Sequence, residues 1–126
     1  MKSAMLKQLK PFLNHILEEA DYLLSESANI DYSEFTKNAT LKRSFVRALE
    51  VIGEAAKNIP DEFREKHQKI RWKDMAGLRD VLIHRYFGIN YNMVWDIVKN
   101  QVPGLKSNIQ ETLMEIEKIE RQEGEK

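Results

Sequence analysis

The sequence predicts an all-α protein, an antiparallel bundle of four to five helices. Apolar residues recur at steps of three and four along most of the chain, the spacing that places side chains on one face of a helix. No segment shows the alternation of apolar and polar residues that is typical of strands. Only 5 Gly and 3 Pro interrupt the 126 residues, so long helices joined by short loops are expected.

Two helices are expected in the first half of the chain. Residues 6–24 have helical spacing, and Pro11 either begins this helix or kinks it. Residues 27–35 break the pattern and predict a loop. The next helix has the clearest pattern, a heptad-like apolar stripe that ends before Pro60. The stripe consists of Leu41, Phe45, Ala48, Ile52, Ala55 and Ile59.

The second half predicts shorter elements and one long helix. The expected elements are a short helical turn at 61–66, a helix from Asp74 to about Tyr86 that Gly88 stops, a helix from Asn92 to Pro103, and a last helix over 105–119. A charged tail is expected to fray from about residue 121. Together these elements predict one domain that covers residues 1–126.

Composition limits the possible functions. The chain has no Cys, which excludes disulfides, a thiolate zinc site and a cysteine nucleophile. Lys plus Arg and Asp plus Glu number 20 each, so binding to nucleic acid would need a local basic patch. Lys42, Arg43 and Arg47 are candidates for that patch, or simply a solvated helix face. No apolar run is long enough for a signal peptide or a membrane span, so a soluble cytoplasmic protein is expected.

Arg79 and His84 are the candidate catalytic residues. Histidine exchanges protons near neutral pH, and the arginine fork stabilises negative charge that develops on phosphate oxygens. RNA supplies its own nucleophile, the 2′-hydroxyl, so the two side chains suffice to produce a 2′,3′-cyclic phosphate. No cluster of His, Asp and Glu has the spacing of metal ligands, so neither a metal nor a cofactor is expected.

The predicted helix would arrange these residues in a particular way. Arg79 and Tyr86 are seven residues apart and would share a face, whereas His84 would be turned away from Arg79. Asp80 precedes His84 by four residues and would lie beside the imidazole, where a carboxylate can fix its tautomer. The spacing also fits an ordinary helix end with an exposed arginine and incidental charges.

The run GLRDVLIHRYFGINYNMVW at residues 77–95 resembles the signature of HepT-like HEPN proteins, in which Arg is followed after four to six residues by His, then by any residue and Tyr. Similar patches occur in order at 52–55, 70–72 and 102–105, so the resemblance covers nearly the whole chain. It implies a HEPN-type helical bundle. Many members have Asn after the motif Arg, whereas this chain has Asp80, whose carboxylate would repel a nearby phosphate.

The resemblance implies a specific function. Family members are metal-independent endoribonuclease toxins that act as homodimers, with the two motifs facing a shared cleft. Their antitoxin is a minimal nucleotidyltransferase, MntA, which adds AMP to the motif Tyr, the position of Tyr86 here. Arg79 and His84 would be catalytic. Glu54 would hold Arg79 in place or be an ordinary surface residue, and Gly53 beside it would serve close helix packing.

Two alternatives remain open at this point. One is a non-catalytic HEPN subunit that binds nucleotide or substrate for a partner nucleotidyltransferase, which needs only the shape and charge of the motif. The other is a helical dimerisation domain without a ligand. In every case a homodimer is expected, alone or within a larger hetero-oligomer, because the apolar faces exceed what one small bundle covers.

Overall fold

The computed structural model describes residues 3–84 and 88–124. Four long helices form most of it. They are α1 (Ser3–Ser27), α3 (Ala39–Lys57), α7 (Tyr91–Asn100) and α8 (Val102–Gly124). The short elements are α2 (Tyr32–Lys37), α4 (Asp61–Lys66), α5 (Trp72–Ala76), α6 (Leu78–Leu82), and the two-residue strands β1 (Ile83–His84) and β2 (Gly88–Ile89). The all-α fold class predicted from the sequence is therefore confirmed.

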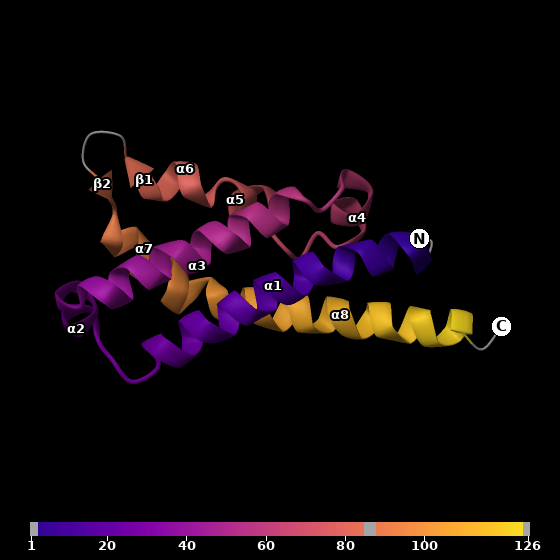
Figure 1. Ribbon diagram of the computed structural model, residues 1–126, viewed down its shortest axis with the longest axis horizontal. Helices are drawn as coiled ribbons and strands as arrows, with labels where there is room; N and C mark the ends of the chain where they lie inside the picture. Colours follow the sequence, from indigo (N-terminus) through magenta and orange to yellow (C-terminus); the bar gives the residue numbers. More distant parts are fainter. Residues whose placement is uncertain (1–2, 85–87, 125–126) are drawn as a thin grey trace.

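Helices α1, α3 and α8 lie side by side, and α7 leads directly into α8 (Figure 1). Helix α1 lies between α3 and α8 and runs antiparallel to both, so the two chain ends lie at the same end of the molecule. Helices α5 and α6 and the β1–β2 hairpin follow one another along α3 on its other side. None of the helices described is long and apolar enough to cross a membrane.

Helical periodicity predicts the long elements well because their apolar stripes face one another in the core. In the α3 stripe, Phe45 and Ile52 are fully buried, and they pack with fully buried Leu13 and Ile16 of α1. Helix α1 begins at Ser3, so Pro11 lies inside this helix and does not start it. The predicted turn at 61–66 is also confirmed as α4.

The loop predicted at residues 27–35 is wrong in its second half, where α2 begins. Asp31 accepts a hydrogen bond from the Glu34 amide at 2.8 Å, and Glu34 accepts one from the Asp31 amide at 3.4 Å. This reciprocal capping box stabilises the first turn of a helix too short to show periodicity. Phe35, fully buried, fixes α2 on the core.

The single helix predicted from Asp74 to Tyr86 is also wrong. The segment contains α5, a break at Gly77, α6, and then a hairpin in which Ile83 pairs with Ile89. Gly88 does not stop a helix. Its positive φ of 77° belongs to the hairpin, where it pairs with His84.

A close helix contact explains Gly53. A Cβ atom at this position would lie only 2.9 Å from the Met75 carbonyl oxygen and 4.0 Å from the Leu78 Cβ. Any larger residue would therefore push α5 and α6 away from α3. The prediction that Gly53 serves close packing is confirmed.

The connection from α3 to α5 is fixed by hydrogen bonds to main-chain carbonyls. Arg64 donates from Nη2 to Ala56 O at 2.7 Å and from Nε to Ile59 O at 2.9 Å. The Trp72 indole donates to His67 O at 3.1 Å. Burial lowers the pKa of His67, whose ring stacks on Phe63, although nearby Glu115 acts in the opposite direction.

We expect Gly53→Ala to destabilise the protein, because the new methyl group would collide with a backbone carbonyl that is held in place. Overpacking of this kind costs about 1–3 kcal/mol. Gly104→Ala is the matched control, since a Cβ there meets no atom within 4 Å and Ala favours a helix. Thermal and urea unfolding of both variants measure the difference. Equal stabilities would contradict the contact.

Candidate active site

Helix α6 positions the first candidate residues. Its buried residues Leu78 and Leu82 face the bundle, where α6 lies against α3 and α7. Arg79 and Asp80 are exposed, as is Val81 with 55% exposure. The helix therefore presents a guanidinium, a carboxylate and an apolar side chain to solvent.

His84 lies beyond the end of α6, in β1. Its backbone pairs with Gly88, and the Asn90 amide closes the hairpin by donating to Leu82 O at 3.2 Å. The helical geometry expected for Arg79, Asp80 and His84 is thus wrong, because the helix ends at Leu82. The chain changes from helix to strand between the two candidate catalytic residues. Between Arg79 and His84 lie the last three residues of α6 and the first residue of β1.

Tyr86 lies outside the described residues, in the stretch 85–87 that joins the two strands. The expectation that it shares a helix face with Arg79 therefore lies outside the described residues as well. Its role as the site of AMP addition stays a prediction.

Glu54 does not meet Arg79 in the part of the chain that the structure describes. Its exposed carboxylate pairs instead with Lys57 at 3.3 Å, one turn along α3. Its main-chain oxygen accepts a hydrogen bond from Asn58 at 2.9 Å. These contacts fit an ordinary surface residue.

The three cations considered for a basic patch on α3 differ in their surroundings. Lys42 lies over the Tyr91 ring, 4.7 Å from its centroid, whereas Arg43 and Arg47 are exposed. Trp95 packs on Phe35 with ring centroids 5.1 Å apart.

A stronger basic cluster, which the sequence-based reasoning missed, precedes the motif. Residues 64–73, here called the basic segment, contain five Lys or Arg and one Glu in a chain with 20 of each sign. The cations are Arg64, Lys66, Lys69, Arg71 and Lys73. Counting charges in a sliding window would have found this segment.

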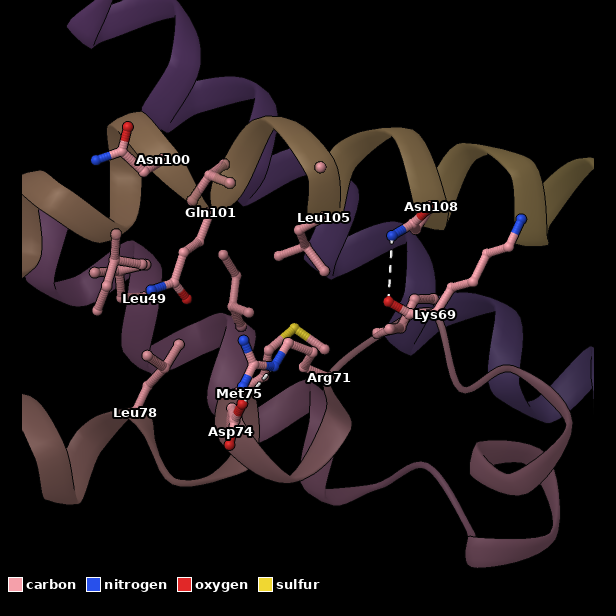
Figure 2. Close-up of a pocket in the computed structure, with 15 residues that line it drawn as sticks. Leu49, Lys69, Arg71, Asp74, Met75, Leu78, Asn100, Gln101, Leu105 and Asn108 are labelled. Atoms are coloured by element: carbon pink, nitrogen blue, oxygen red, sulfur yellow. Dashed lines mark hydrogen bonds and ion pairs between the residues drawn. The ribbon is translucent and has the colours of Figure 1, made fainter.

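A cavity of about 280 Å³ lies beside the basic segment (Figure 2). We call it the α7–α8 cavity, because the junction of these helices forms one wall and α3, α5 and the basic segment form the others. No sequence pattern predicts it, since its walls come from separate parts of the chain. Among residues 3–84 and 88–124, no group of three His, Asp or Glu side chains is placed to hold a metal ion.

The fold and the motif together define a class. The protein is a small helical bundle with an exposed arginine at one end of a short helix and a histidine in the hairpin that follows. This residue pair suits phosphodiester chemistry that needs no metal.

Comparisons with known proteins are consistent with that class. The family model described as "Ribonuclease HepT-like" matches residues 7–112. The chain therefore belongs to the HepT-like ribonuclease family, as the sequence motif predicts. The comparison with solved structures found no match.

Three relatives illustrate the similarity. A "Putative RNase" of Caldanaerobacter subterraneus is 47% identical over 108 residues, which is 86% of this chain and 96% of the relative. One of Methanocaldococcus jannaschii is 45% identical over 104 residues, 82% of this chain and 95% of the relative. The "Probable ribonuclease HepT" of Thermococcus cleftensis is 37% identical over 106 residues, 84% and 96% respectively. The similarity extends over nearly the full length of each relative.

We expect Gly88→Ala to loosen the hairpin that contains His84, because an L-residue at a φ of 77° is strained. The strain costs about 1 kcal/mol. Hydrogen exchange at the Asn90 amide should accelerate, while exchange in α1 and α8 should be unchanged. Gly77→Ala is the control, since its Cβ would make only an ordinary 3.5 Å contact. Unchanged exchange at Asn90 would contradict this description of the hairpin.

Proposed function

We propose that the protein is a metal-independent endoribonuclease toxin of a toxin–antitoxin pair that cleaves RNA with Arg79 and His84. The observation that supports this most strongly is the motif Arg-x4-His-x-Tyr at the junction of α6 and the hairpin, in a chain that belongs to a ribonuclease family. Its substrate is cytoplasmic RNA. Asp80 is its proposed supporting residue, as the exposed carboxylate next to Arg79 in α6.

The proposed reaction is a transesterification within the RNA. The imidazole of His84 takes the proton of a 2′-hydroxyl, whose oxygen forms a bond to the adjacent phosphorus as the bond to the 5′-oxygen breaks. The 5′-oxygen leaves and takes a proton from solvent water, the His84 imidazolium returns its proton to solvent, and the RNA keeps a 2′,3′-cyclic phosphate. The Arg79 guanidinium stabilises the negative charge that builds up on the phosphate oxygens.

We further propose that two copies of the chain form the site, with their motifs facing one cleft. Val81 supports this interface, because a large apolar side chain with 55% exposure lies directly between the motif residues in sequence. Glu54 would then act by contacts across the cleft. Light scattering distinguishes such a dimer from a monomer of 14.8 kDa.

We expect Arg79→Ala and His84→Ala each to lower the rate of RNA cleavage by about 10²–10⁴, because each removes a group that acts only in the transition state. Unfolding temperatures should stay close to that of the wild type, since Arg79 is exposed and His84 lies in a short two-stranded hairpin. The matched controls are Arg121→Ala and His15→Ala, which alter exposed residues in α8 and α1.

Near wild-type cleavage by His84→Ala would remove the imidazole from the mechanism. Absence of cleavage and of toxicity in the wild type would instead favour the alternative, a non-catalytic HEPN subunit that binds nucleotide or substrate for its partner.

We also propose that an MntA-like minimal nucleotidyltransferase silences the protein by adding AMP to the Tyr86 hydroxyl. The added group would be bulky and negatively charged close in sequence to Arg79, so it would exclude the RNA phosphate by volume and by repulsion. After incubation with ATP and the partner enzyme, mass spectrometry should find AMP on Tyr86. Tyr86→Phe should lose the adduct, whereas Tyr22→Phe, which alters an exposed tyrosine of α1, should keep it. An adduct found only elsewhere would refute the proposal.

A further inference from the structure

We propose that the α7–α8 cavity holds one unpaired base of single-stranded RNA, while the basic segment binds the phosphates next to that base. This inference rests on the proposed ribonuclease function and names a substrate subsite outside the Arg-His motif. Four features support it: the size of the cavity, its apolar floor, its amide rim and its charge.

The cavity fits a flat apolar group of limited size. Its volume of about 280 Å³ lies just below the range of roughly 300–1,000 Å³ for drug-sized ligands. The floor combines aliphatic side chains from three helices and the α7–α8 junction, and these are Leu49, Ile52, Met75, Val102 and Leu105. A base in this cavity would be held by burial of its ring faces against apolar side chains, one of the ways in which proteins hold bases taken out of a duplex or strand.

Amide side chains line the edge of this floor. Asn100, Gln101 and Asn108 all border the cavity, and Gln101 extends toward it from the junction (Figure 2). Asn108 donates to Lys69 O at 3.3 Å, which ties α8 to the basic segment, and Asn100 donates to Asp96 at 2.7 Å, so Gln101 is the amide placed to contact a base. Asn and Gln are the side chains that pair most readily with the N6 and N7 atoms of adenine. An oligoadenylate is therefore the appropriate probe.

The basic segment provides charge complementarity to RNA. Lys69 and Arg71 border the cavity, and the side chain of each is 78% exposed. Their ion pairs with Glu111 at 4.0 Å and Asp74 at 2.7 Å are surface contacts, which contribute little and exchange readily for phosphate. In a chain without net charge, such a cluster is what backbone binding requires.

The position of the cavity connects it with the motif. Leu78, which lines the cavity, is the residue immediately before Arg79. A strand with one base in the cavity and its phosphates on the basic segment would therefore continue past α6. A second copy of the chain could cover the apolar floor, but it would not account for the cations and amides around it.

Binding of an uncleavable strand tests the proposal. The probe is a fluorescent 2′-O-methyl octaadenylate, compared by anisotropy with an abasic strand of the same length and charge. The wild type should bind the adenine strand about tenfold more tightly, because the abasic strand has no ring to bury against the apolar floor. Gly104→Leu should bring that ratio near one, because Gly104 borders the cavity and its Cβ would enter open space. Gly104→Ala should keep most of the ratio.

Charge variants separate the two parts of the subsite. Lys69→Glu should weaken binding of both strands and reduce the salt dependence, while Lys118→Glu, at an exposed position of α8 outside the cavity lining, should change little. If Gly104→Leu unfolds at a lower temperature, Gln101→Ala provides the second test, and it should also lower the preference for adenine over abasic strands.

Three results would overturn the proposal. The first is a wild type that does not prefer the adenine strand, and the second is a Gly104→Leu variant with an unchanged ratio of adenine-strand to abasic-strand affinity. The third is a Gly104→Leu variant whose oligomeric state, measured by light scattering, differs from that of the wild type. That result would assign the cavity to contact between two copies of the chain. Cleavage is measured separately on unmodified RNA. Adenine preference without cleavage would refute the proposed ribonuclease function but support the base-binding subsite. Cleavage without adenine preference would support the ribonuclease function but refute the subsite.

Discussion

The contact between α3 and α5 at Gly53 is the constraint on which the candidate site depends. The missing side chain allows the Met75 carbonyl to approach to 2.9 Å of where a Cβ would be, so α5 and then α6 lie directly on α3. Leu78 and Leu82 complete this contact from α6. Arg79 is exposed because Leu78 and Leu82 turn the opposite face of α6 toward the bundle. The α7–α8 cavity keeps its floor because α5 is held against α3. A change in this one contact would shift the cavity and the motif together.

The end of α6 determines how the motif is displayed. A continuous helix would place Arg79 and His84 on different sides, five residues apart at about 100° each. The hairpin replaces that geometry, because Gly88 adopts a positive φ and Asn90 bonds back to Leu82. The histidine is thereby placed on a strand, where its position depends on backbone pairing and not on the helical repeat.

The sequence predicts those parts of the fold that local periodicity determines. The α3 stripe, the end at Pro60, the α4 turn and the last two helices follow from apolar spacing and from proline. Helix α2 is missed because its signal is a capping box over a few residues, and the helix predicted to Tyr86 is wrong because strand pairing outweighs helical propensity after Leu82. The motif residues are recognised through family resemblance, whereas the cavity cannot be, since its walls meet only after folding.

The chemistry of the cleaved ends tests the central claim most directly. Purified wild-type protein is incubated with RNA in the presence of EDTA, and the termini of the products are determined by mass spectrometry and by their reactivity with kinase and phosphatase. We expect cleavage to persist and to yield 2′,3′-cyclic phosphate and 5′-hydroxyl ends, because the RNA provides the nucleophile and Arg79 and His84 provide the catalysis. Products with 3′-hydroxyl and 5′-phosphate ends, or cleavage that EDTA abolishes, would contradict the proposed mechanism.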